Sequence, residues 1–208
     1  MCIHYNMKAL ISALLPLLAS VICPRQYSST YQAYSKLKPA TFSITHNHRF
    51  KSQNGRLDIV SSSGKVVRFN NTATNINETD RKTYNYLGES DLINGFFVHE
   101  MGYELGSIIM ITKSGKKVSV CDIPYVSPHG KLAVSLSQSV ESDLIPNGIQ
   151  VLRIESGEVI NKCDIPVSAI EPQDLRWIDD KSFIVKFQYF TEDGDKVNRF
   201  SYKVYTVK

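Results

Sequence analysis

The chain has 208 residues, of which 42% are hydrophobic and 21% charged, values typical of a globular protein of one or two domains. Its formal net charge is +4, and no run of Lys or Arg concentrates that charge. A nucleic-acid interface normally requires a clustered basic patch, so the sequence argues against one and supports only a weak general attraction for anionic partners.

The N-terminus has the pattern of a secretory signal. Met7-Lys8 gives a short positive start, an apolar stretch follows, and small residues stand at Ala19 and Ser20. The apolar stretch of about 15 residues is shorter than the ~20 needed to cross a bilayer, and Pro16 interrupts it, so we expect no transmembrane anchor. We therefore predict that residues 1–23 are a signal peptide and that the protein is secreted or periplasmic.

Cys23 offers an alternative to plain secretion, namely a lipid anchor of the bacterial lipoprotein type. Such a signal normally has a small residue just before the Cys, whereas Ile22 precedes it here. Lipidation of Cys23 is therefore the less favoured prediction.

Removal of the signal leaves Cys121 and Cys163 in the mature domain. Two thiols in an oxidising compartment favour a disulfide, which requires their Cα atoms to lie within ~7 Å of each other. The alternative is two buried, unpaired cysteines.

After the signal, the pattern predicts a linker or N-terminal arm over residues 24–40 and a single domain over residues 41–208. Residues 24–38 are rich in Ser and Tyr without an apolar period. Beyond them, short apolar runs alternate with turns rich in Gly, Pro, Asn or Asp, and no window has a convincing helical period. In chain order, strands are predicted at 41–50, 56–60, 65–69, 84–87, 93–99, 106–112, 117–121, 131–137, 149–154, 159–163, 175–178, 183–189 and 199–207. The fold class is all-β.

A spaced motif occurs twice and organises these strands. Ser114-Gly115 and, after a further five residues, Cys121-Asp122-Ile123-Pro124 recur as Ser156-Gly157 and Cys163-Asp164-Ile165-Pro166 at an offset of 42. The match indicates a duplicated unit of strand, Ser-Gly turn and strand. Residues 55–70, with Ser63-Gly64 in the turn, follow the same plan, which gives about three units. Each is followed by a second turn and another apolar strand.

Residues Val126 to Ser135 (VSPHGKLAVS) resemble the Ser-Pro-Asp-Gly-Lys turn of the propeller repeats in periplasmic TolB-like proteins, with His129 in place of the usual Asp. The stretch from Ser127 to Phe187 is also similar to a family of uncharacterised exported bacterial proteins. The resemblance implies a periplasmic β-repeat protein and carries over no catalytic residue. We expect propeller-like antiparallel sheet repeats, with a β-sandwich as the alternative, and note that three units fall short of a closed propeller.

The sequence contains no strong catalytic or cofactor motif. His46 and His48 share one strand face, but a third metal ligand would have to come from His99 or His129. Residues 192–195 (EDGD) lack the full calcium-loop spacing, and Gly-rich phosphate loops are absent, so we expect no metal and no cofactor. Cysteines that recur at a repeat offset favour a structural role over nucleophilic catalysis.

The favoured functional hypothesis is a non-enzymatic exported protein that binds a protein or cell-envelope partner, including an inhibitor or immunity-type role. Aromatic residues are numerous, and Tyr125, His129 and Trp177 are candidate partner-binding residues. The alternative is a hydrolase of unfamiliar type with its site in the inter-strand turns, where His129, Asp179 and Asp180 occupy equivalent places in the repeat. A purely structural role in the envelope is a third option.

Overall fold

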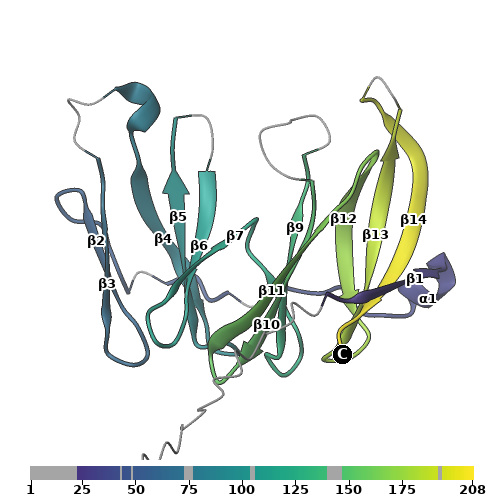
Figure 1. The fold of residues 1–208 in the computed structure, drawn as a ribbon, viewed down its shortest axis with the longest axis horizontal. Helices are drawn as coiled ribbons and strands as arrows, with labels where there is room; N and C mark the ends of the chain where they lie inside the picture. The colour runs from purple at the N-terminus through teal and green to yellow at the C-terminus, as the bar shows by residue number, and fades with distance from the viewer. Residues whose placement is uncertain are drawn as a thin grey trace, which may run out of the picture.

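The computed structural model describes residues 23–42, 44–47, 49–72, 77–103, 106–139, 147–191 and 194–208. Within them the chain forms one two-stranded and three four-stranded antiparallel sheets, which lie in a row (Figure 1). No helix in these ranges has the length and apolar character needed to cross a membrane.

The sheets follow one another along the chain. The first sheet pairs β2 (Arg56–Val60) with β3 (Val66–Asn70), and the second has the order β4 (Thr83–Ser90), β5 (Gly95–Met101), β6 (Gly106–Ile111) and β7 (Lys117–Val120). The third has the order β8 (Tyr125–Val126), β9 (Leu132–Ser137), β10 (Gly148–Glu155) and β11 (Glu158–Pro166). The fourth has the order β12 (Ile170–Trp177), β13 (Ser182–Phe190), β14 (Lys196–Thr206) and β1 (Arg25–Ser29). Two short helices, α1 (Tyr31–Ser35) and the 3-10 turn η1 (Glu78–Asp80), complete the described elements.

The all-β prediction is confirmed, and every strand predicted after residue 55 has a counterpart. The predicted strand over residues 41–50 is wrong for the residues described, because Phe42 and Thr45 form only isolated bridges, to Tyr125 and Glu89. Sequence reasoning also missed β1, the two-residue strand β8 and α1, which are short and have no apolar period.

The sequence repeat and the sheets are out of phase. The Ser-Gly turns join the last two strands of successive sheets, β2 to β3, β6 to β7 and β10 to β11, whereas the following turn starts the next sheet. One 42-residue repeat therefore supplies half of one sheet and half of the next. This offset explains why three units were predicted where the structure has four sheets, the first of them built from two strands.

Each inner sheet buries both of its faces. Along β5, Phe96 and Val98 pack with the first sheet, whereas Phe97 packs with the third. Along β10, Leu152 faces the second sheet and Val151 faces the fourth. Successive side chains of a strand point to opposite faces, so strands in the middle of the row are apolar at consecutive positions. Burial of this apolar surface between neighbouring sheets holds the row together.

The N-terminal arm completes the fourth sheet. Strand β1 pairs with β14 over Arg25–Ser29, so the edge of β14 is covered by a strand from the other end of the chain. Helix α1 then docks on β12, where Tyr34 donates to the Asp174 carboxylate and the Arg176 guanidinium lies 4.0 Å from the Tyr34 ring centroid. Residues 24–40 are therefore an ordered arm rather than a linker.

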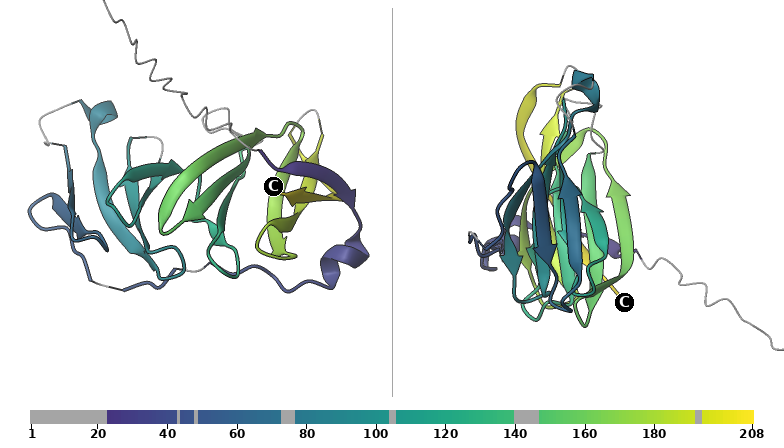
Figure 2. Two further views of the ribbon diagram at one scale, coloured as in Figure 1. Left: turned by 60° about the horizontal axis from the view of Figure 1, so that its bottom comes forward. Right: turned by 90° about the vertical axis from the view of Figure 1, so that its left-hand side faces the viewer.

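From α1 the chain runs the length of the row to β2 (Figures 1 and 2). On the way it touches the first strand of each four-stranded sheet in reverse order. The Ala40 amide donates to the Leu175 carbonyl, the Phe42 ring stacks on Tyr125, and Thr45 pairs with Glu89. We call residues 40–42 and 44–47 the strap, because they contact three sheets in succession.

The structure forms a disulfide between Cys23 and Cys163, with a Cα–Cα distance of 5.4 Å, and Cys121 is a free thiol. The predicted Cys121–Cys163 disulfide is therefore not formed. Cys163 pairs across the ladder with Val151, whose side chain faces the fourth sheet, whereas Cys121 follows β7 in the second sheet, on the other side. Because the side chain of Cys163 points to the same face of the sheet as that of Val151, it points away from Cys121 and toward the start of the arm.

Replacing Cys23 by Ser should lower the free energy of unfolding by about 2–4 kcal/mol, because the cross-link spans 140 residues and restricts the unfolded chain. Cys23 is exposed, so the substitution removes the bond without placing a hydroxyl in the core. Guanidinium denaturation without reductant measures the change. Cys121→Ser is the control, and an equal loss in that variant would contradict the assignment.

Candidate functional site

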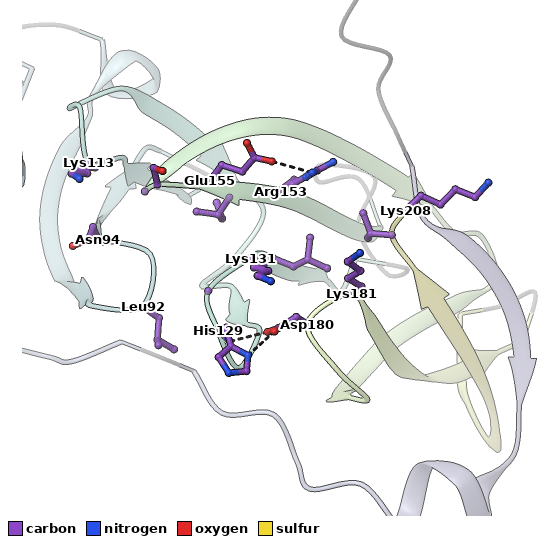
Figure 3. Close-up of a pocket in the computed structure, with 16 residues that line it drawn as sticks. Leu92, Asn94, Lys113, His129, Lys131, Arg153, Glu155, Asp180, Lys181 and Lys208 are labelled. Carbon is purple, nitrogen blue, oxygen red and sulfur yellow. Dashed lines mark hydrogen bonds and ion pairs between the residues drawn. The ribbon is translucent and has the colours of Figure 1, made fainter.

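A cleft of about 740 Å³ opens where turns of the second, third and fourth sheets meet, at the end of the strands near the C-terminus (Figure 3). Its walls come from the β4–β5, β6–β7, β8–β9, β10–β11 and β12–β13 turns and from the chain end after β14. These turns are far apart in the sequence, and only the stacking of sheets brings them to one place. We call this site the basic cleft.

The side chains that line the basic cleft carry an excess of positive charge. Two carboxylates, Glu155 and Asp180, face five cationic side chains, so the net charge is +3 with His129 neutral. Arg153 is paired with Glu155 at 3.0 Å. Among the described residues, no ion pair is formed by the remaining four cations: Lys113, Lys131, Lys181 and Lys208.

His129 and Asp180 line the basic cleft and join the third sheet to the fourth (Figure 3). The His129 backbone amide donates to Asp180 Oδ1 at 2.8 Å, and His129 Nδ1 lies 2.5 Å from Asp180 Oδ2. Because a carboxylate only accepts, Nδ1 carries the proton in this contact. The His129 side chain is 76% exposed, whereas that of Asp180 is 18% exposed.

Burial raises the pKa of Asp180, but the hydrogen bonds from the amide and ring of His129 outweigh it and hold that pKa below its usual range. The neighbouring Asp179 is engaged differently, because its Oδ1 accepts the amides of Lys181 and Ser182, both at 2.7 Å. Asp179 therefore fixes its own turn, and only Asp180 reaches the third sheet.

Close approach of the turns depends on glycine. Gly130 has φ +70°, and a Cβ there would lie 2.2 Å from the Leu92 carbonyl oxygen in the β4–β5 turn. The Ser-Gly turns are linked in series, since the Ser63 amide donates to the Lys113 carbonyl and the Lys113 amide donates to the Gly157 carbonyl. Backbone hydrogen bonds therefore connect the turns of the first, second and third sheets.

The structure places the three candidate partner-binding residues in different surroundings. His129 lines the basic cleft. Tyr125 is partly buried against Phe42 and lines a different cleft, and Trp177 packs edge-on against Phe183 beside the core between the third and fourth sheets. Partner binding through Tyr125 and Trp177 stays a prediction.

The weak metal candidates fall partly outside the described residues. His48 and residues 192–193 are not described, and within the described ranges no group of three or more His, Cys, Asp or Glu side chains is arranged to hold a metal ion.

Sequence reasoning found His129 and Asp180 but missed the lysines. Lys131 and Lys181 directly follow the two turns that it placed at equivalent positions, which was the available signal. They were overlooked because basic residues are scattered along the sequence and gather only in three dimensions.

Comparison with known proteins found no match: no family model, no curated protein sequence and no solved structure is significantly similar to the chain. The basic cleft is therefore interpreted from its own geometry.

Replacing Gly130 by Ala should destabilise the protein by about 1–3 kcal/mol more than replacing Gly64 by Ala, because the new methyl overlaps the Leu92 carbonyl. Gly64 has a similar φ of +84° with nothing within 4 Å of a Cβ, so it isolates the cost of the left-handed backbone. Thermal and denaturant unfolding compare the two variants. Equal losses would show that the turns do not depend on this close approach.

The Asp180 contact should make stability depend on pH. Since the folded pKa lies below the ordinary value of 3.8, the contribution is present above that value and is lost as the pH falls through the folded pKa. The difference in unfolding midpoint between the wild type and Asp180→Asn should therefore be larger at pH 6 than at pH 2.5. A difference that is constant across this range would contradict the ionised contact.

Proposed function

We propose that the protein is an exported binding protein that engages an acidic segment of a protein, or an anionic cell-envelope component, through the basic cleft. The observation that carries this proposal is the side-chain charge of +3 around one cleft, with four lysines that form no ion pair among the described side chains. An inhibitor or immunity-type role is one form of such binding.

The lysines favour a broad anionic partner over one small anion. They come from separate turns around the cleft and form no single bidentate pocket (Figure 3). Flexible ammonium groups of this kind attract and orient a charged partner chiefly through long-range electrostatics. Backbone hydrogen bonds between neighbouring turns hold Lys113 in place, which limits the entropy cost of binding there.

The disulfide supports the export part of the proposal. Disulfides persist in oxidising compartments, and Cys23 is bonded to Cys163 in the folded domain. We therefore place the cleavage site before Cys23 rather than after it. The same sulfur cannot carry both a disulfide and a lipid thioether, so the bond also favours a secreted or periplasmic protein over one lipid-anchored through Cys23.

We also propose that the row of sheets is propeller-like. Successive four-stranded antiparallel sheets in chain order, with β1 completing the fourth sheet from the other end of the chain, support this interpretation. The resemblance to TolB-like repeats points the same way.

The contact between His129 and Asp180 is the one observation that favours the alternative, a hydrolase. It supplies a base and an orienting carboxylate, with Nε2 left over for a reacting group. Within the described residues, however, His129 has no hydrogen bond to a Ser, Thr or Cys side chain. The two contacts to Asp180 are explained by the need to join two turns, so binding remains the favoured function.

Charge reversal tests the proposal. Lys131→Glu/Lys181→Glu should weaken binding to a fluorescent polyglutamate peptide at least ~10-fold, because each reversal replaces attraction by repulsion in the cleft. The matched control is Lys36→Glu/Lys38→Glu, which makes the same change in net charge at exposed positions in and after the C-terminal cap of α1. The affinities are measured by fluorescence anisotropy at low and high salt.

The same variants decide between general charge attraction and a specific partner. The wild type should retain one defined envelope protein or component from extracts of its native host, and the cleft variant should lose it while the control keeps it. Equal weakening in both variants, or no partner lost by the cleft variant, would overturn the proposal.

A further inference from the structure

A second cleft opens beside the strap. It has a volume of about 400 Å³, and its walls come from Phe42 of the strap, the connection from β7 to β8, Tyr125 of β8 and the end of β9. It shares no lining residue with the basic cleft. We call it the strap cleft. Its volume falls within the range of small-molecule sites.

An exposed aromatic ring forms one wall of the strap cleft. The Phe42 ring stacks on the Tyr125 ring, with the two centroids 4.4 Å apart and an interplanar angle of 23°. The stack covers one face of the Phe42 ring, yet Phe42 is 51% exposed, so the other face is open to solvent. The face of an aromatic ring carries the negative part of its quadrupole and attracts cations. This wall therefore suits a positively charged group.

Asp122 supplies a negative charge without a matching positive one. It is the one charged side chain among the described residues that line the strap cleft, and it forms no ion pair with another described residue. Its Oδ1 accepts the Ile123 amide at 2.7 Å, and the Ser135 hydroxyl donates to its backbone carbonyl at 2.9 Å. These bonds hold the carboxylate in place and leave Oδ2 as an acceptor for a ligand.

Two other groups in the cleft feel the charge of Asp122. Burial raises the pKa of the Tyr125 hydroxyl, and the nearby carboxylates of Asp174 and Asp122 raise it further. Burial also raises the pKa of the Cys121 thiol, and Asp122 again acts in the same direction. A carboxylate raises the pKa of a neutral acid because it opposes a second negative charge nearby. The same field favours a cation.

Gln138 adds an oriented acceptor directly after β9. Its Nε2 donates to the Pro172 carbonyl at 2.8 Å. A carbonyl oxygen only accepts, so this contact identifies the donor side of the amide and leaves Oε1 as the acceptor. Gln138 is exposed and lines the cleft, so a ligand can reach this side chain. An aromatic face, a carboxylate and a carboxamide oxygen together match an ammonium ion, whereas Asp122 would repel a carboxylate or a phosphate.

We propose that the strap cleft binds a small organic ammonium ion, whose positive nitrogen lies against the open face of Phe42 and near the Asp122 carboxylate. N–H groups, where the ion carries them, bond to the side-chain oxygens of Asp122 and Gln138. Tyr125 holds the Phe42 ring in place. The ligand has the opposite charge to the partner proposed for the basic cleft and uses other residues, so either proposal can fail without the other.

The test compares choline with 3,3-dimethylbutan-1-ol, which has the same shape but a carbon in place of the charged nitrogen. Choline should bind with a dissociation constant of about a millimolar at low salt. The neutral alcohol should bind at least ~5-fold more weakly, since it gains neither cation–π nor ionic attraction. Chemical shifts of backbone amides measure both affinities and locate the bound probe. Equal affinities, shifts outside the cleft or absence of saturable binding would overturn the proposal.

Two variants of Phe42 test the aromatic ring. Phe42→Leu should weaken choline binding at least ~3-fold, because leucine keeps an apolar side chain but has no π face. Phe42→Tyr should keep the affinity of the wild type, because it retains the ring at a half-exposed position. Thermal unfolding checks that both variants are folded. Equal choline binding by the wild type and Phe42→Leu would contradict the role assigned to the ring.

A variant of Asp122 tests the charge. Asp122→Asn should weaken choline binding at least ~3-fold at low ionic strength, and added salt should narrow the difference, because salt screens an exposed carboxylate. The matched control is Asp195→Asn, which makes the same change in net charge at an exposed position between β13 and β14 and should bind choline as the wild type does. Equal weakening in both variants would reduce the effect to net charge and overturn the site. If a cleft variant does not fold, the comparison of the two probes on the wild type still decides.

Discussion

The fold depends on the N-terminal arm and the strap, residues 23–42 and 44–47, which tie together sheets that the rest of the chain makes from consecutive strands. An antiparallel sheet built from neighbouring hairpins is complete in itself, and stacking such sheets in a row leaves free edges and two outer faces. Strand β1 covers the edge of β14, and α1 docks on β12 at one end of the row. The strap then contacts the first strand of each four-stranded sheet. At the other end, the outer face of the first sheet carries Arg56, Asp58 and Arg68 in an ion-pair network that water can solvate.

Stacking also explains how a protein with scattered basic residues acquires a basic cleft. Each sheet contributes its turns to the same end, and Gly130 and the linked Ser-Gly turns let the turns approach until their backbones touch. Lysines that follow or belong to those turns are then held around one cavity. Their mutual repulsion is tolerated because the ammonium groups remain in water, where charge interactions are weak, and because Glu155 and Asp180 lie among them. A desolvating acidic partner would strengthen these interactions.

The basic cleft carries charge because it lies at the turn end of the strands. At the turn end, polar residues face solvent and collect charge. The cysteines follow the same geometry. Equivalent positions in two sheets place Cys121 directly after β7 and Cys163 on the far face of the next sheet, where the arm begins.

Local pattern was sufficient to determine the fold class, nearly every strand after residue 55 and the recurring Ser-Gly turns, because strand periodicity and turn chemistry act over a few residues. It also placed the turns of His129 and Asp180 at equivalent positions in the repeat. Tertiary structure alone decided that those two side chains meet, that Lys131 and Lys181 share a cleft, and that Cys163 bonds to Cys23. It also made Phe42 and Thr45 parts of the strap rather than of a strand. These features depend on contacts between segments that are 44 to 140 residues apart, and on which face of a strand meets which neighbour. No local pattern encodes either of these.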